Sequence, residues 1–96
     1  MGRVVGKKAF VTGAGSGLGR AISEMLAFEG AKVCVTDINL DSAQATRDAI
    51  NESNGDGSAF AFAHDVTSES EWQTTLEAGA EAMGGMSILV NNAGIG

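Results

Sequence analysis

A glycine-rich segment at residues 12–19 has the residue types that could hold a phosphate. The segment is TGAGSGLG, and it follows the short apolar run KAFVT at residues 8–12. Glycines let the backbone turn tightly and approach a ligand with no Cβ in the way. The start of the helix expected from residue 17 offers free N–H groups and the positive end of a helix dipole, which suits a pyrophosphate. The G-x-x-x-G-x-G spacing from Gly13 differs from the usual dinucleotide pattern G-x-G-x-x-G, so a simple tight turn is the alternative interpretation.

A single carboxylate stands where it could bind a ribose. Asp37 lies 18 residues after Gly19, at the end of the apolar run AKVCVTD. A carboxylate at the end of the second strand of a dinucleotide-binding fold can accept hydrogen bonds from an adenosine ribose. The same charge would repel a 2′-phosphate about 5 Å away by about 3 kcal/mol at an effective dielectric constant of about 20. The sequence therefore favours NAD over NADP, and a helix N-cap or an exposed turn is the alternative role for Asp37.

The apolar pattern predicts four strands alternating with three helices, which would position these residues. Strands are expected at 8–12, 31–37, 58–63 and 86–90, and helices at 17–29, 40–53 and 69–83. A capping box of Ser68 and Glu71 opens the third helix. Its inward face is expected to be Trp72, Leu76, Ala80 and Met83, and Gly79 inside it costs about 1 kcal/mol relative to alanine. Such alternation predicts an α/β fold with a parallel sheet and right-handed crossovers.

Composition excludes several classes of partner. The 96 residues carry a net charge of −6, with 12 acidic against 6 basic residues, which argues against nucleic acid and an anionic membrane surface. No apolar run approaches the ~18 residues of a membrane span. A single cysteine, Cys34, rules out an intramolecular disulfide and suits a reducing compartment. Because the first 13 residues also lack the apolar run of a signal peptide, a cytoplasmic location is expected. One histidine and one cysteine do not make a conventional zinc site, and His64 and Cys34 are expected to be structural.

Taken together, four motifs resemble the short-chain dehydrogenase/reductase family. They are TGAGSGLG at 12–19, Asp37, Asp65-Val66, and Asn91-Asn92-Ala93-Gly94, and the resemblance runs from about residue 3 to residue 96. It implies a Rossmann-type doubly wound parallel sheet of strand order 3-2-1-4. It also implies an oxidoreductase that moves hydride between NAD(H) and a small carbonyl or secondary alcohol, and a complete enzyme that forms a homo-oligomer.

The resemblance also implies roles for individual residues. The loop from Gly13 to Gly19 would hold the pyrophosphate, and Ser16 and Leu18 would donate backbone N–H groups or line the adenosine pocket. Asp65 would bind the adenine amino group, and Val66 would form one wall of that pocket. Asn92 would lie near a ribose. The expected cofactor-binding residues are Gly13, Ser16, Gly17, Leu18, Gly19, Asp37, Asp65, Val66, Asn92, Ala93 and Gly94, and no metal ligand is expected.

The sequence departs from the family in its chemistry. The family uses a serine and a Tyr-x-x-x-Lys pair for acid–base catalysis, whereas these 96 residues contain no tyrosine. No catalytic residue is therefore expected here, and residues 1–96 are expected to be the N-terminal, cofactor-binding part of one Rossmann domain. The run at 88–90 would then be an exposed strand edge, through which the chain alone would self-associate. A stand-alone nucleotide-binding module and a non-functional fragment are the alternatives.

Overall fold

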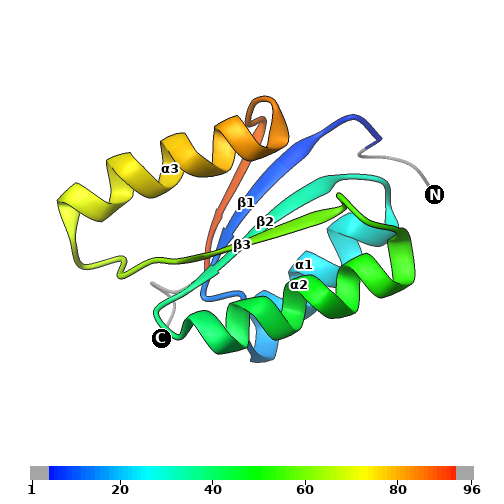
Figure 1. Ribbon diagram of the computed structural model, residues 1–96, viewed down its shortest axis with the longest axis horizontal. Coiled ribbons are helices and arrows are strands. Elements are labelled where there is room, and N and C mark those ends of the chain that lie inside the picture. Colours follow the sequence, from blue (N-terminus) through cyan, green and yellow to red (C-terminus); the bar gives the residue numbers. More distant parts are fainter. Residues whose placement is uncertain (1–4, 93–96) are drawn as a thin grey trace.

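Four parallel strands form the central sheet of the computed structural model, which describes residues 5–92 (Figure 1). The strands are β1 (Lys8–Thr12), β2 (Lys32–Asp37), β3 (Ala59–Ala63) and β4 (Ile88–Asn91), and their order in the sheet is β3-β2-β1-β4. The helices α1 (Gly17–Phe28), α2 (Leu40–Asn54) and α3 (Glu69–Met83) follow the first three strands in turn. The alternation and the strand order confirm the predicted Rossmann-type doubly wound sheet.

The helices cover both faces of this sheet. Helices α1 and α2 lie together on one face, and α3 lies on the other (Figure 1). A right-handed crossover from β1 to β2 and from β2 to β3 places α1 and α2 on the same face, and the reversed direction from β3 to β4 places α3 opposite. The winding direction therefore changes between β1 and β4, and the carboxyl ends of the strands meet at one edge.

Small aliphatic side chains fill the face beneath α1 and α2. The buried cluster there includes Val11, Val33, Val35 and Ile50 together with several alanines. Val11 pairs with Val35 on one side and with Val90 on the other, so these residues form a row across the sheet. Small residues allow the two helices to pack closely on the strands.

Larger side chains fill the face beneath α3. Phe10, Cys34 and Met83 are buried there, and Trp72 and Leu76 of the predicted inward face pack against them. Gly79 is buried as well, and a Cβ at this position would lie 2.9 Å from the Phe10 ring and 3.0 Å from Cys34 Sγ. The close approach of α3 to the sheet at this point therefore explains why the helix contains a glycine here despite its low helix propensity.

Strand β4 differs from its prediction. The continuous apolar run 86–90 predicts a strand covered on both faces, but β4 begins at Ile88 and its residues alternate between half-buried and exposed, with Leu89 51% exposed. The prediction was wrong because β4 pairs with β1 and forms an edge of the sheet over the described residues. The edge itself was expected, and self-association through it stays a prediction.

None of the helices in residues 5–92 is both long and apolar enough to cross a bilayer.

Candidate functional site

The carboxyl ends of the strands open into a cleft of about 580 Å³. Seven of the eleven residues expected to bind a cofactor line it: Gly13, Ser16, Leu18, Asp37, Asp65, Val66 and Asn92. Gly17 and Gly19 belong to the same glycine loop, in the first turn of α1. Ala93 and Gly94 lie outside the described residues. Ile38 and Thr67, which sequence reasoning missed, and His64, for which a structural role was expected, also line the cleft, each within two residues of one of the expected aspartates.

The glycine loop is shaped by its backbone. Gly13 has a φ of +61°, which favours glycine, and the next amide, that of Ala14, donates to Thr36 O over 2.8 Å. A Cβ at Gly19 would overlap the carbonyl oxygen of Gly13, so this helix start and this turn can meet only with glycine. The loop therefore needs its glycines for packing as well as for turning.

The start of α1 is left open for an anion. Its N-cap residue, Ser16, has an extended backbone and makes no side-chain capping hydrogen bond, and its first turn holds no acidic residue. The first N–H groups of a helix have no partner within the helix. These groups and the helix dipole can therefore act on a negatively charged group in the cleft.

A buried threonine from α2 supports the same loop. Thr46 is fully buried, and its Oγ1 donates to Ala14 O over 2.9 Å. Sequence reasoning missed this residue. Its place in the stripe of Ala43, Thr46 and Ile50, the buried residues of α2, is the only sequence signal that could have found it.

The carboxylate of Asp37 is held in a fixed orientation. Its Oδ2 accepts from the Gly15 amide and its Oδ1 from the Asn39 amide, each over 3.0 Å. Asn39, rather than Asp37, is the N-cap of α2, because its side chain accepts from the Ser42 amide. The alternative N-cap role for Asp37 was therefore wrong. Each carboxylate oxygen can accept a further hydrogen bond, so Asp37 can still bind hydroxyl groups in the cleft.

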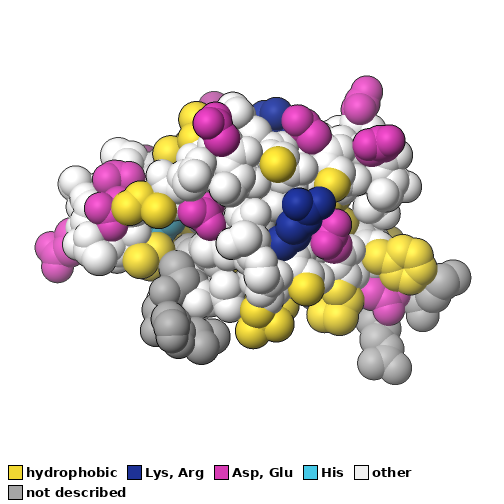
Figure 2. All heavy atoms as spheres, turned by 90° about the horizontal axis from the view of Figure 1, so that it is seen from below, with side chains coloured by type: hydrophobic (Ala, Val, Ile, Leu, Met, Phe, Trp, Pro, Cys, Tyr) yellow, Lys and Arg dark blue, Asp and Glu magenta, His cyan; other side chains and the backbone are white. Residues whose placement is uncertain are grey.

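None of the lysines and arginines in the described part of the chain lines the cleft. Arg20 lies 3.7 Å from Glu24, and Arg47 lies 2.9 Å from Asp48. Lys8 and Lys32 begin their strands, at the end of the sheet opposite the cleft. Acidic side chains are spread over the face drawn in Figure 2, and the described residues form no continuous basic patch there. No lysine or arginine among the lining residues therefore offsets the negative charge of Asp37 in the cleft.

Asp65, on the other side of the cleft, is held by hydrogen bonds with Thr67 and Glu71. Thr67 donates to Asp65 Oδ1 through its hydroxyl over 2.6 Å and through its amide over 2.9 Å. These two hydrogen bonds hold the pKa of the Asp65 carboxyl below its usual value, so the group stays ionised. The Asp65 amide donates to Glu71 Oε1 over 3.1 Å, and Trp72 Nε1 donates to Val66 O over 2.8 Å.

The predicted capping box forms only in part. The Ser68 hydroxyl accepts from the Glu71 amide over 3.4 Å, as predicted. The Ser68 amide, however, donates to Asp65 O over 3.0 Å, and the Glu71 carboxylate accepts from Asp65. The side chain of Glu71 thus binds the loop before the helix.

The histidine beside Asp65 is buried in the core. His64 is 2% exposed, and neither of its ring nitrogens has a hydrogen-bond partner among residues 5–92. Its ring stands edge-on to Trp72, with centroids 4.4 Å apart, and edge-on to Phe10 at 5.9 Å. Burial lowers the pKa of His64, and the charges of Glu71 and Asp65 oppose that effect. The ring is therefore part of the core, as expected.

The thiol of Cys34 is also buried. Burial raises the pKa of Cys34 to about 12, which fits the expected structural role and leaves the thiol unreactive.

The end of β4 reaches the glycine loop. Asn92 Nδ2 donates to Gly13 O over 3.3 Å, and Thr12 Oγ1 donates to Asn91 Oδ1 over 3.0 Å. The structure thus brings together two expected parts of the site that are separated by 79 residues. No group of three or more metal-ligating side chains occurs between residues 5 and 92.

Comparison with known proteins identifies the class of this fold and cleft. The family model for short chain dehydrogenases matches residues 7–96. The chain belongs to this family, the short-chain dehydrogenases/reductases.

Individual relatives show how much of the family the chain covers. It is 44% identical over 94 residues to the 7α-hydroxysteroid dehydrogenase of Escherichia coli strain K12, which is 98% of this chain and 36% of that enzyme. A crystal structure of hydroxysteroid dehydrogenase from Escherichia coli matches with a TM-score of 0.86 at 40% identity, over 91% of this chain and 36% of that one. A 3-ketoacyl-(acyl-carrier-protein) reductase from Brucella melitensis, solved with NADH, matches with a TM-score of 0.81 at 35% identity, over 90% and 34%. The chain thus spans about a third of the length of these relatives.

Proposed function

We propose that residues 1–96 are the NAD-binding part of an oxidoreductase that moves hydride between NAD(H) and a small carbonyl or secondary alcohol. One observation carries this proposal: a single cleft gathers the glycine loop, Asp37 and Asp65 at the carboxyl ends of three parallel strands. Doubly wound sheets bind ligands at this edge, where the winding direction changes. Two structural neighbours support the choice of cofactor, since one was solved with NADH and another, from Burkholderia phymatum, with NAD.

The glycine loop fits a pyrophosphate. The uncapped start of α1 presents the N–H groups of Gly17, Leu18 and Gly19, and Ser16 lines the cleft beside them. The close contact of Gly19 with the Gly13 carbonyl keeps the loop tight against the helix. Asn92 fixes Gly13 from the other side, and we assign Ala93 and Gly94 to the same stretch of the site.

Asp37 and Asp65 fit the adenosine half of the cofactor. Asp37 would accept hydrogen bonds from the ribose hydroxyls, and Asp65 from the adenine amino group, with Val66 as a wall of the pocket. A 2′-phosphate near Asp37 would meet a fixed carboxylate, because Gly15 and Asn39 hold both of its oxygens. This supports NAD over NADP.

The bound cofactor would supply the hydride. No residue of this sequence is assigned to catalysis, since the 96 residues contain no tyrosine. We extend the proposal to a cytoplasmic enzyme that forms a homo-oligomer and acts on a small molecule.

The cofactor assignment is tested with the product of the complete reading frame that contains this sequence. Calorimetry would measure the affinities for NAD and NADP before and after Asp37→Ala. We expect the NAD/NADP affinity ratio to fall about a hundredfold, the factor that corresponds to about 3 kcal/mol of charge repulsion. Asp41→Ala removes the same charge from an exposed position in the first turn of α2 and should leave the ratio unchanged.

Two other results would contradict the assignment. A ratio that Asp37→Ala does not change would mean that Asp37 does not select the cofactor. Binding of NAD without any dehydrogenase activity, over a range of carbonyl and alcohol substrates, would favour a nucleotide-binding module over an enzyme.

A further inference from the structure

We infer that Glu71 and Trp72, in the first turn of α3, are positioning residues for the adenine end of the dinucleotide. Neither side chain is assigned to touch the cofactor. Each instead holds the backbone of one of the two residues expected to do so. The inference rests on the proposed function, because it concerns the same cleft.

Two side-chain hydrogen bonds join the helix to the loop. Glu71 Oε1 accepts from the Asp65 amide over 3.1 Å, and Trp72 Nε1 donates to Val66 O over 2.8 Å. Both contacts cross from α3 to the segment that follows β3. Two adjacent residues of α3 thus bind two adjacent residues of the loop after β3. These hydrogen bonds couple the position of Asp65 and Val66 to the position of the helix.

The Glu71 carboxylate is used for the loop rather than for its own helix. In a capping box, the glutamate at this position would accept from the amide of the N-cap residue. Here that amide, of Ser68, is bound to Asp65 O over 3.0 Å, which leaves Glu71 to bind the Asp65 amide. Both backbone polar groups of Asp65 are therefore bonded to α3 or to its N-cap.

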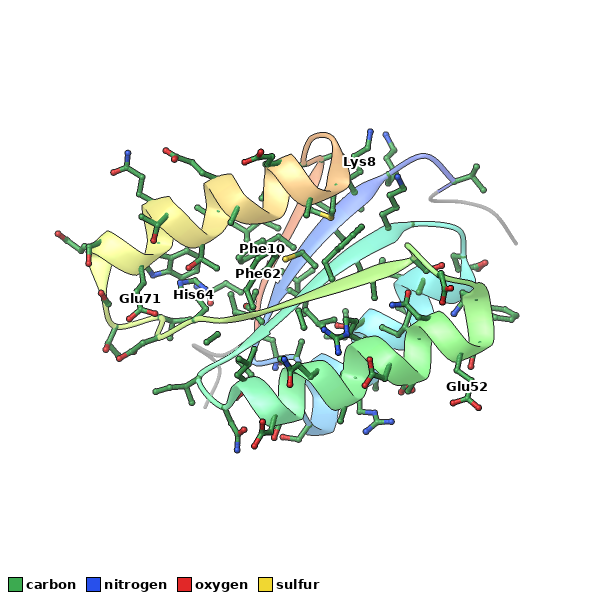
Figure 3. All side chains as sticks on the ribbon, viewed as in Figure 1. Lys8, Phe10, Glu52, Phe62, His64 and Glu71 are labelled. Carbon is green, nitrogen blue, oxygen red and sulfur yellow. The ribbon has the colours of Figure 1, made fainter. Side chains whose placement is uncertain are left out.

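The indole of Trp72 is itself held in place. Its ring packs edge-on against His64, which is buried and also contacts Phe10 of β1. Figure 3 shows Glu71 and His64 beside each other near the start of α3, with Phe10 further into the core. These ring contacts with His64 restrict rotation of the indole, and they keep its Nε1–H group directed at Val66 O.

The consequence is a fixed position for one carboxylate. Thr67 orients the side chain of Asp65 through two hydrogen bonds, whereas Glu71 fixes its backbone. The side chain of Asp65 can select the adenine amino group only if both are in place. Loosening the α3 contacts should therefore reduce recognition of that amino group more than it reduces binding of the rest of the cofactor.

The test compares NAD with nicotinamide hypoxanthine dinucleotide, which has a carbonyl oxygen in place of the adenine 6-amino group. The protein is the product of the complete reading frame, and calorimetry gives both affinities. Without substitutions we expect a preference for NAD of about tenfold or more, the effect of one hydrogen bond to a charged group. Trp72→Phe and Glu71→Ala should each reduce this preference by about threefold or more, because each removes one tie.

Two further variants serve as controls. Glu71→Gln keeps an oxygen that can accept from the Asp65 amide, so it should retain the preference. Gln73→Ala removes a hydrogen bond from the same helix turn to Glu77, within α3, and it should also retain the preference. Because Trp72→Phe keeps an aromatic ring against His64, it tests the inference even if Glu71→Ala does not fold.

The outcomes separate positioning from structural support. A preference that Trp72→Phe leaves unchanged, with any loss confined to thermal stability, would overturn the inference alone. A loss with Glu71→Gln as large as with Glu71→Ala would overturn the hydrogen-bond role of Glu71. If the unsubstituted protein binds neither dinucleotide, the proposed function fails, and this inference fails with it.

Discussion

The two sides of the cleft are built by different means. The glycine side has hydrogen bonds from main-chain and side-chain groups, and it also depends on a close backbone contact of Gly19 with the Gly13 carbonyl that leaves no room for a Cβ. The Asp65 side is held by hydrogen bonds, which involve side chains of α3, the hydroxyl and amide of Thr67, and the amide of Ser68. The close backbone contact on the glycine side leaves no room for an added atom. The hydrogen bonds on the Asp65 side can instead be removed one at a time by substitution. The glycine side should therefore fail abruptly on substitution, and the Asp65 side gradually.

The largest expected effect is on the glycine side. Gly19→Ala places a Cβ against the Gly13 carbonyl oxygen and 2.7 Å from Asn92 Nδ2; the side-chain end of Asn92 can move aside, but the Gly13 carbonyl belongs to the backbone and cannot do so without shifting the loop. We expect a loss of about 3 kcal/mol or more in the free energy of unfolding, at the upper end for overpacking. Urea denaturation of the protein from the complete reading frame measures it.

A second glycine of the same loop provides the control. Gly17 has a φ of +57°, but a Cβ there would have no atom within 4 Å. Gly17→Ala should therefore cost only the backbone strain of about 1–2 kcal/mol. Equal losses for the two variants would contradict the role given to close packing.

The next effect tests Thr46, whose side chain supports the glycine loop from α2. Thr46→Val keeps the shape of the side chain but leaves the buried carbonyl of Ala14 without its hydrogen bond from Thr46. We expect a loss of about 1–3 kcal/mol in the free energy of unfolding. Thr74→Val is the matched control, because Thr74 is exposed on α3 and bonds within its own helix. A cost for Thr46→Val no larger than this control would mean that α2 does not support the loop.

The smallest effect concerns the pH dependence of the Asp65 side. The pKa of His64 in the folded protein is lowered from 6.5 by burial, so the unfolded chain binds more protons as the pH falls below about 6.5. The free energy of unfolding should therefore decrease below that pH, by at most about 1.4 kcal/mol per pH unit. Denaturation at pH 7.5 and 5.5 measures this, and His64→Phe should flatten the decrease. An equal slope in the variant would assign the dependence to other groups.

The sequence predicted the residues of the glycine side more completely than the contacts that hold the Asp65 side, because only the former follow from spacing along the chain. The glycine loop and Asp37 form a local pattern between a strand and a helix, so spacing alone could point to them. Thr46, Glu71 and Trp72 act through contacts that depend on where a helix lies against the sheet. The pattern at Ser68 and Glu71 even predicted a different partner for Glu71, since spacing could not show that the Asp65 carbonyl occupies the Ser68 amide. Strand order followed from the resemblance, and the half-exposed state of β4 did not follow from its apolar run.

The bond between Asn92 and Gly13 also bears on the order in which the chain assembles. This bond closes a loop of 79 residues, whereas Gly15 and Asp37 are 22 residues apart and Asp65 and Glu71 only 6. The entropy of loop closure makes the longest connection about 2 kcal/mol more costly than the shortest. We therefore expect the Asp65 loop and α3 to associate first, and the docking of β4 beside β1 to come last. In a refolding protein, the phosphate end of the cleft would be the last part to become complete.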